Sequence, residues 1–250
     1  MWNRLTTERE VSLRDPVLIV SVSTSLPQYR ILYSQARELA RFMLSKMEFE
    51  RLASLYASAL PPAFLIRQDG TAGLVATHFY RHSGNKRDII LFAGDSAPVD
   101  EQYEFADAVL SYAKRLGVKE IFSIGPRWTD QPIPALDVPK VYGFATDLLG
   151  VQDLMMNGVQ IIKDEPAPFF ASLVVGRAEL FGLRGYKLAV NHGEPLPHPK
   201  SVIEFLRVLM KMVGFEVGLA ELEEEARHMP VPAETSPDTQ SRQQRDGIYH

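Results

Sequence analysis

The pattern of hydrophobic and polar positions divides the first part of the chain into a short apolar block and longer amphipathic ones. Residues 16–22, PVLIVSV, form a β-branched apolar run, typical of a strand that is buried on both faces. Residues 29–47 place apolar side chains at the i, i+3, i+4 and i+7 positions of an amphipathic helix. Residues 49–60 predict a second helix, which Pro61 and Pro62 terminate.

The middle of the chain contains the clearest unit. Residues 63–80 predict two strands joined in a hairpin around the Asp-Gly pair at 69–70. Residues 88–95 predict a strand, 99–117 a helix and 118–125 another strand, which together make a βαβ crossover. Acidic residues begin the expected helix, and two basic residues followed by a glycine end it, as the helix dipole and the left-handed stop favour.

Strand and helix patterns continue to alternate after residue 139. We expect strands at 140–147, 159–162 and 186–193, and helices at 148–158, 168–182, 199–214 and 219–229. Alternation of this kind predicts an α/β fold with a mostly parallel sheet and helices on both of its faces. The last of these helices is charged and amphipathic, and it closes the expected folded part.

The last part of the chain has a different composition. Residues 230–247 contain three prolines and no aromatic residue, so they bury too little apolar surface to offset the loss of chain entropy. A coil of this length has a typical reach of about 25 Å. We therefore expect an N-terminal extension at 1–15, one α/β domain at 16–229 and a flexible tail at 230–250.

Composition narrows the cellular setting. The chain has 250 residues, of which 46% are hydrophobic and 23% are charged, enough for one large domain. It has no cysteine, so a reducing compartment is the natural setting. The N-terminal residues lack the apolar run of a secretory signal, and no stretch approaches a membrane span. The net charge of -4 gives no general attraction to phosphate backbones. We expect a cytoplasmic protein without nucleic-acid or membrane partners.

Candidate chemistry is sparse. The chain contains no GxxxxGK[ST], GxGxxG, HExxH or GxSxG motif. Asp95 and Ser96 follow an expected strand at the edge where open α/β sheets bind ligands, although the same side chains suit a turn and a helix start. His192 and Glu194 follow another expected strand. They suit three roles, namely an acid–base pair, a pair of metal ligands, or a turn in which the histidine is hydrogen-bonded. These signals are weak, and we expect no metal and no cofactor.

Four segments carry a family resemblance in their order along the chain. They are PVLIVSV at 16–22, DIILFAGDSAPVDEQYEFADAVLSYAKRLGVKEIFSIG at 88–125, VYGFATD at 141–147, and GFEVGLAELEEEA at 214–226. Together they resemble the proteasome assembly chaperone 2 family, including its archaeal homo-oligomeric members. The resemblance implies a three-layer α/β/α sandwich, similar to phosphorylases and hydrolases, with a chaperone role and no established reaction. Many relatives have a glycine-rich turn after the first strand, whereas this chain has STSLPQYR, which weakens any ligand function at that turn.

The chain ends in Ile248-Tyr249-His250. This ending resembles the hydrophobic-tyrosine-any (HbYX) motif by which proteasome activators and assembly chaperones bind the α-ring of the core particle. In such a motif the terminal carboxylate pairs with a lysine, the tyrosine supplies a ring with a hydroxyl, and the aliphatic side chain buries apolar area. One tail binds weakly, so we expect a homo-oligomer that engages several pockets at once.

Two functions from different classes follow from the sequence. The first is a non-enzymatic proteasome assembly chaperone or adaptor that binds α-ring subunits through its tail. The alternative is an enzyme of the phosphorylase or hydrolase type, which would use Asp95, Ser96, His192 and Glu194 around a small ligand. A protein that only assembles with itself, and binds neither a ligand nor the proteasome, is a third possibility.

Overall fold

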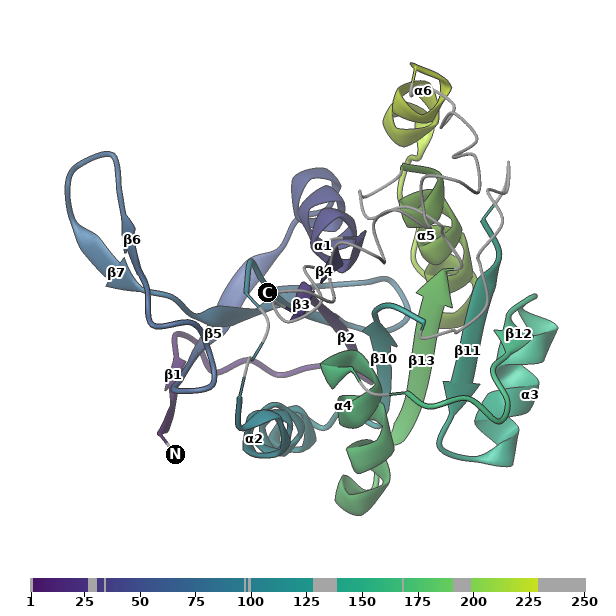
Figure 1. Ribbon diagram of the computed structural model, residues 1–250, viewed down its shortest axis with the longest axis horizontal. Helices are drawn as coiled ribbons and strands as arrows, with labels where there is room; N and C mark the ends of the chain where they lie inside the picture. The colour runs from purple at the N-terminus through teal and green to yellow at the C-terminus, as the bar shows by residue number, and fades with distance from the viewer. Residues whose placement is uncertain are drawn as a thin grey trace, which may run out of the picture.

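A large sheet between two layers of helices forms the body of the protein (Figure 1). The computed structural model describes residues 2–26, 31–33, 35–96, 98, 100–127, 139–167, 169–190 and 199–228. Over these residues the sheet has nine strands, in the spatial order β1 (Asn3–Thr7), β5 (Glu50–Ala57), β8 (Thr77–His82), β9 (Ile89–Gly94), β2 (Val17–Val22), β10 (Glu120–Ile124), β13 (Arg184–Val190), β11 (Val141–Ala145) and β12 (Gln160–Ile161). The predicted α/β/α sandwich is confirmed.

The centre of the sheet is parallel. Strands β9, β2, β10 and β13 run in one direction, and every residue of β2 is buried, as its apolar sequence predicted. Antiparallel pairs extend the sheet on both sides, through β8, β5 and β1 beyond β9, and through β11 beyond β13. The sheet is therefore mixed, and the parallel arrangement expected from the alternating pattern applies to its central strands.

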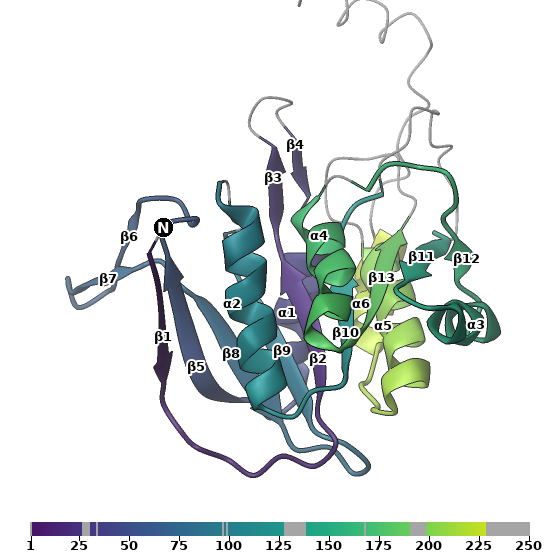
Figure 2. The same cartoon turned by 90° about the horizontal axis from the view of Figure 1, so that it is seen from below.

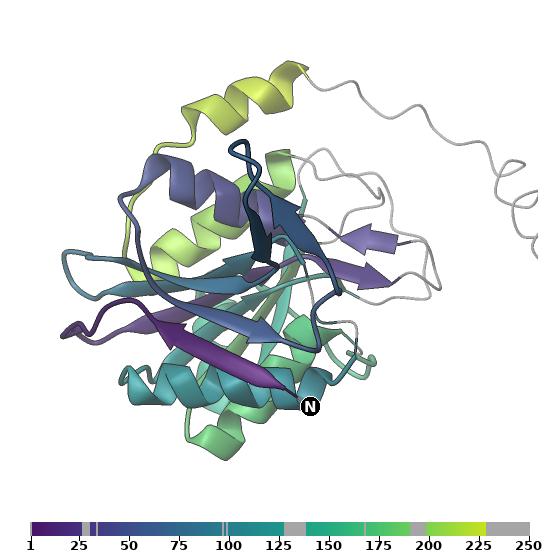
Figure 3. The ribbon, with the colours of Figure 1, turned by 90° about the vertical axis from the view of Figure 1, so that its left-hand side faces the viewer.

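Helices cover both faces of the sheet (Figures 2 and 3). One layer consists of α1 (Gln35–Lys46), α5 (Pro199–Val213) and α6 (Ala220–His228), and the other of α2 (Gln102–Arg115) and α4 (Phe170–Ala178). Each layer has its own hydrophobic core against the sheet. In the second core, the rings of Phe79, Phe92, Phe105 and Phe170 follow one another at 4.5–6.0 Å between centroids. Each buried ring contributes about 1.5–3 kcal/mol, so these contacts hold the layer in place.

The end of α2 shows how the local sequence determines where a helix stops. Lys114 and Arg115 lie in its last turn, where positive charge is favourable, and Gly117 follows with a φ of +78°. The amide of Val118 donates to the carbonyl of Ala113, which closes the turn. The predicted crossover from β9 through α2 to β10 is confirmed, and β2 lies between its two strands.

Two expectations about the early part of the chain were wrong. The segment expected to be a helix at 49–60 contains the strand β5, which pairs with β1 and β8, because pairing and burial outweigh the helix propensity of its alanine and leucine residues. The helix expected over 29–47 begins at Gln35. Before it, β3 (Thr24–Leu26) and β4 (Ile31–Tyr33) pair with each other.

A hairpin projects from the body between β5 and β8 (Figure 1). It consists of β6 (Phe64–Ile66) and β7 (Ala72–Leu74), as the Asp-Gly turn predicted. Asp69 accepts a 2.9 Å hydrogen bond from the amide of Thr71, and Gly70 has a φ of +81°. The hairpin forms a separate two-stranded sheet.

The N-terminal extension contributes to the fold, since β1 pairs with β5 at one edge of the sheet. At the opposite edge, α3 (Leu148–Met156) packs beside β11 and β12. No helix among the described residues is long and apolar enough to cross a membrane.

Candidate functional site

The carboxyl ends of β9, β2, β10 and β13 lie along one edge of the sheet, where Asp95 and Ser96 were expected. Both residues directly follow β9. The Asp95 carboxylate is largely exposed and accepts a 2.9 Å hydrogen bond from the guanidinium of Arg41 on α1. Exposed pairs of this kind contribute at most about 1 kcal/mol. Asp95 is therefore an exposed residue that already has a cationic partner.

His192 and Glu194 lie outside the described residues. The strand that precedes them, β13, is separated from β9 by β2 and β10. At about 4.8 Å between neighbouring strands, the ends of β9 and β13 lie roughly 14 Å apart. The four candidate residues thus follow strands that are not neighbours, and a small-ligand site made of all four stays a prediction. The three residues expected to bind the proteasome, Ile248, Tyr249 and His250, also lie outside the described residues.

Lys187 on β13 is a buried base that the sequence reasoning missed. The residue is 1% exposed, and its amine donates a 2.9 Å hydrogen bond to the carbonyl of Leu188. Gly125 makes room for it, because a Cβ at this position would lie 3.1 Å from the lysine nitrogen and 2.5 Å from Ala171 Cβ. Burial lowers the pKa of Lys187 well below its usual value. The only sequence signal was a lone charge in an apolar strand.

A small cavity borders the amine of Lys187. It has a volume of about 10 Å³ and is also lined by Ser172, from the first turn of α4, and by Arg127 and Glu165. Arg127 donates a 2.9 Å hydrogen bond to Glu165 and lies 4.2 Å from the ring centre of Tyr142. A neutral lysine amine is a nucleophile or a base in many enzymes. The space beside this one, however, is about the smallest that holds a water molecule.

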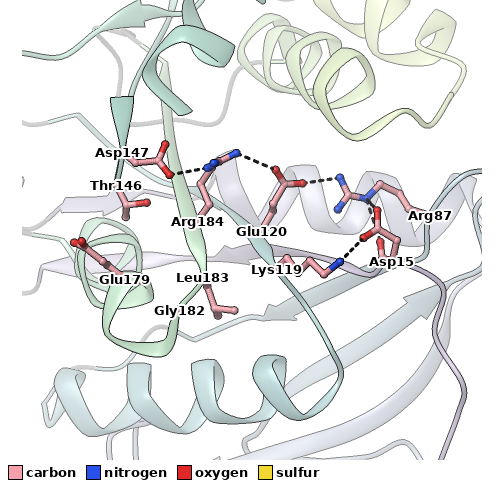
Figure 4. Close-up of a pocket in the computed structure, with 10 residues that line it drawn as sticks. All are labelled: Asp15, Arg87, Lys119, Glu120, Thr146, Asp147, Glu179, Gly182, Leu183 and Arg184. Atoms are coloured by element: carbon pink, nitrogen blue, oxygen red, sulfur yellow. Dashed lines mark hydrogen bonds and ion pairs between the residues drawn. The ribbon is translucent and has the colours of Figure 1, made fainter. Parts of the chain in front are cut away.

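A larger, charged cavity lies at the opposite edge of the sheet, near the amino ends of the central strands (Figure 4). Its volume is about 540 Å³. The lining residues come from the segments that lead into β2, β9, β10, β13 and α3, namely Asp15, Arg87, Lys119, Glu120, Thr146, Asp147, Glu179, Gly182, Leu183 and Arg184. The sequence reasoning missed this cavity because its charges come from segments far apart along the chain.

The basic side chains of the charged cavity are paired with acidic ones. The ion pairs join Arg87 to Glu120 at 2.7 Å, Arg184 to Asp147 at 2.7 Å and Lys119 to Asp15 at 3.8 Å. Tyr186 donates to Asp153 at 3.0 Å, and burial raises the pKa of its hydroxyl above its usual range. Such a hydroxyl stays protonated. A ligand would have to displace existing ion pairs, so the arrangement mainly joins the amino ends of neighbouring strands.

The described part of the chain contains no group of three or more His, Cys, Asp or Glu residues placed to hold a metal ion. At the carboxyl edge Asp95 pairs with Arg41, and at the amino edge the charges pair with one another. The described residues at these two edges therefore bring together no nucleophile with a base and an orienting group, which is the arrangement that covalent catalysis needs.

Comparison with known proteins supplies the family. The family model described as "PAC2 family" matches residues 36–231 of this chain, which is more than half of its length. The chain belongs to the PAC2 family. This assignment agrees with the resemblance of the central segments to the proteasome assembly chaperone 2 family.

Several proteins are similar to this PAC2 family member. The uncharacterized protein MJ1210 of Methanocaldococcus jannaschii is 23% identical over 196 residues, which cover 77% of this chain and 74% of that one. The crystal structure of Pyrococcus furiosus PbaB, titled an archaeal proteasome activator, has a TM-score of 0.76 at 19% identity and covers 98% of both chains. That of Pyrococcus furiosus PbaA, titled an archaeal homolog of proteasome-assembly chaperone, has a TM-score of 0.70 at 20% identity and covers 90% of this chain and 92% of that one. At these identities the structures establish the shared fold.

Proposed function

We propose that this PAC2 family protein is a proteasome assembly chaperone or adaptor, which binds the α-ring of the core particle through Ile248, Tyr249 and His250. The observation that carries the proposal is a coincidence within one chain. A match to the PAC2 family model over residues 36–231 is followed by a sequence that ends in a hydrophobic residue, a tyrosine and one further residue. Either feature alone is weak evidence for proteasome binding, and their combination is specific.

The described roles of structural relatives support the proposal. PbaB is described as an archaeal proteasome activator and PbaA as a homolog of proteasome-assembly chaperone. A Mycobacterium tuberculosis protein with a TM-score of 0.64 at 18% identity, covering 94% of this chain and 96% of that one, is described as a proteasome-assembly chaperone homologue. These proteins share the architecture of this chain, so a related role is the simplest expectation.

The docking chemistry follows from the last three residues. Ile248 would bury apolar area, and the Tyr249 ring would add area and a hydroxyl for hydrogen bonding. The carboxylate of His250 would pair with a lysine in a pocket between neighbouring α subunits. The last described helix, α6, ends at His228 on the outer side of the α1 and α5 layer (Figure 3). The composition of residues 230–247 predicts a tether that carries the motif away from this surface.

A single short tail gives a weak complex, because few side chains contribute and the tether loses entropy on binding. A homo-oligomer would present several tails to a ring of equivalent pockets. Linked binding events raise the apparent affinity by about 10²–10⁴-fold when their spacing allows simultaneous engagement. We therefore include homo-oligomerisation in the proposal and place the protein in the cytoplasm, beside the proteasome.

Deletion of residues 248–250 tests the proposal. The core particle is mixed with the intact protein or with the deletion variant, and binding is read as a shift on a native gel. We expect the deletion to reduce binding at least about tenfold, because it removes both anchoring side chains and displaces the carboxylate.

A matched control removes three residues from within the tail. Deletion of residues 239–241 shortens the predicted tether by the same amount and leaves the last three residues intact. This variant should bind nearly as well as the intact protein. Equal binding by the intact protein and the variant without residues 248–250 would remove the docking mechanism from the proposal.

A further inference from the structure

Lys187 is a buried amine without an ionic partner in the described part of the chain. Its nitrogen donates to the carbonyl of Leu188, which also accepts a 3.1 Å hydrogen bond from the amide of Gly125. Burial alone lowers the pKa of the amine well below 10.5, and no described carboxylate contributes to its environment. The folded chain therefore favours a neutral amine, whose lone pair is that of a nucleophile.

The first turn of α4 lies beside this amine, since α4 packs on β10 and β13 (Figure 2). Gly125 touches both, because a Cβ built there would lie 3.1 Å from the Lys187 nitrogen and 2.5 Å from Ala171 Cβ. The helix has no side-chain cap at Phe169. The amides of Phe170 and Ala171 precede the first intrahelical bond, and the described contacts give them no acceptor. The amine thus lies near the positive end of a helix dipole that has two unused donors.

The cavity of about 10 Å³ beside Lys187 also includes Ser172, in the first turn of α4. Its other walls are mostly apolar, from Pro126, Phe144, Ile162, Pro166 and Ala167. The ion pair of Arg127 and Glu165 completes the lining, with side chains that are 17% and 27% exposed. Because these two side chains reach the solvent, a shift of the pair enlarges the cavity beyond the size of one water molecule.

The charge of the product decides which electrophile suits this amine. An aldehyde gives an imine, which becomes a cation on protonation, and a buried cation near the positive end of α4 is costly. Carbon dioxide gives a carbamate, which is an anion. Helix amides, a hydroxyl and a guanidinium stabilise an anion, and all three are present around this cavity. Carbon dioxide is also small and neutral, so it passes apolar walls more readily than an ion does.

We propose that carbon dioxide modifies Lys187, whose amine forms a carbamate in the cavity at the start of α4. The lone pair of the nitrogen forms the new N–C bond, and one C=O π pair moves to an oxygen. The nitrogen then releases a proton to the solvent, so R–NH₂ and CO₂ give R–NH–COO⁻ and H⁺. The new carboxylate accepts hydrogen bonds from Ser172 and the first amides of α4, and it pairs with Arg127.

This modification site is separate from the proposed docking tail. Lys187 lies within β13, whereas the docking residues are the last three of the chain. The carbamate also replaces an amine that is costly to bury with an anion that has partners, so carbon dioxide stabilises the folded state. The experiment contains no core particle, and its result does not depend on proteasome binding.

Carbon-13 NMR tests the inference. The protein is equilibrated with carbon-13-labelled bicarbonate, which supplies labelled carbon dioxide, at about pH 7.5. Exposed lysines have a pKa of about 10.4, so they stay protonated and react little, whereas the α-amino group has a pKa of about 8 and gives a background carbamate signal. Signals beyond this background report a neutral lysine.

Three variants locate the signal. Lys187→Met removes the amine, and Lys119→Met is the matched control because its side chain is 79% exposed. We expect a carbamate signal beyond the background in the unaltered protein and in Lys119→Met, and its loss in Lys187→Met. Ser172→Ala keeps the amine and removes one donor, so the occupancy of the carbamate should fall about fivefold.

Chemical trapping gives a second readout that needs no variant. Trimethyloxonium methylates the carbamate of the unaltered protein to a stable ester, and mass spectrometry of its peptides then identifies the modified residue. We expect the ester on Lys187 and not on Lys119.

Three outcomes would overturn the inference. The unaltered protein could give no signal beyond the α-amino background. The signal could persist in full in Lys187→Met, or the trapped ester could lie on other lysines. Unchanged occupancy in Ser172→Ala would contradict the placement of the carbamate at the start of α4.

Discussion

At the scale of single residues, Lys187 is the most unusual feature of the described structure. Its amine is buried beneath α4, and a backbone carbonyl accepts its one described hydrogen bond. A buried cation without a counter-ion is costly, so the folded state favours the neutral amine. Gly125 and the small cavity beside the amine indicate that the surroundings accommodate this side chain.

The variant Lys187→Met should be more stable than the unaltered protein at pH 7, by about 1–3 kcal/mol in the free energy of unfolding. The unfolded chain has the ordinary lysine pKa of 10.5, whereas the folded chain has a lower one. Between these two values the unfolded state binds the additional proton, so the stability of the unaltered protein rises with pH and levels off above 10.5. Urea unfolding should therefore give a smaller difference in the free energy of unfolding between Lys187→Met and the unaltered protein at pH 10 than at pH 7.

A suitable control is Lys119→Met, which changes an exposed lysine and should alter the free energy of unfolding by at most about 0.5 kcal/mol. Lys119 has a side chain that is 79% exposed. A loss of stability in Lys187→Met would contradict this interpretation, since it would mean that the amine makes a contact that stabilises the fold.

Residue-level chemistry was only partly predictable from the sequence. The positions of Asp95 and Ser96 after a strand followed from the apolar run before them. The partner of Asp95 did not, because Arg41 is 54 positions away and reaches it only through the packing of α1 on the sheet. Lys187 gave one local signal, a charge within YKLAV, and its burial depends on α4 and Gly125.

At the scale of elements, α3 shows how one capping residue positions a helix with exposed apolar side chains. The side chain of Asp147 accepts a 2.6 Å hydrogen bond from the amide of Gly150 and pairs with Arg184 at 2.7 Å. Gly150 is required at its position, since a Cβ there would lie 2.7 Å from Ala145 Cβ. These contacts fix the first turn of the helix, where Leu148 and Leu149 are exposed.

Replacement of Asp147 by alanine should lower the free energy of unfolding by about 1 kcal/mol at pH 7, because the helix loses its cap. Two hydrogen bonds hold the pKa of the Asp147 carboxyl below its usual value of 3.8. The one from the Gly150 amide has the larger effect, and the one from the Arg184 side chain comes second. The stabilisation is therefore present above pH 3.8 and is lost as the pH falls through the lower, folded-state pKa. Denaturant titrations at pH 7 and pH 3 measure the difference.

Asparagine is the informative control at position 147, since its side chain can still accept the hydrogen bond from the Gly150 amide. Asp147→Asn should retain most of the stability at pH 7. If the alanine and asparagine variants were equally unstable, the charge pair with Arg184 would account for the effect in place of the cap.

Elements with their own signals were predictable from the sequence, and elements defined by their neighbours were not. The helix α2 has charged ends and a stop glycine, and the hairpin has an Asp-Gly turn, so both were expected. Strand β5 contains leucine, alanine, serine, glutamate and arginine, which favour or tolerate a helix. It is a strand because β1 and β8 pair with its two edges.

At the scale of the whole molecule, the order of the strands was the least predictable feature. The βαβ unit indicated that β9 and β10 are parallel, but their separation by β2 depends on pairing between distant segments. The same applies to β1, which joins the sheet edge by pairing with residues about 50 positions later. A local pattern does not identify which distant segment a strand pairs with.

The exposure of apolar side chains on the β6–β7 hairpin and on α3 also belongs to this scale. Sequence alone marked 63–80 as a hairpin and 148–158 as a helix, with no sign that either would expose apolar side chains. The structure places these elements at opposite ends of the molecule.

The central claim is that the terminal carboxylate docks the protein on the α-ring, and adding one alanine after His250 tests it most directly. This change keeps every side chain of the tail and moves only the charged end by one residue. Binding of the intact and extended proteins to immobilised core particle should differ at least about tenfold, because a carboxylate that is displaced by one residue no longer reaches its lysine. Equal affinities for the two proteins would contradict the claim.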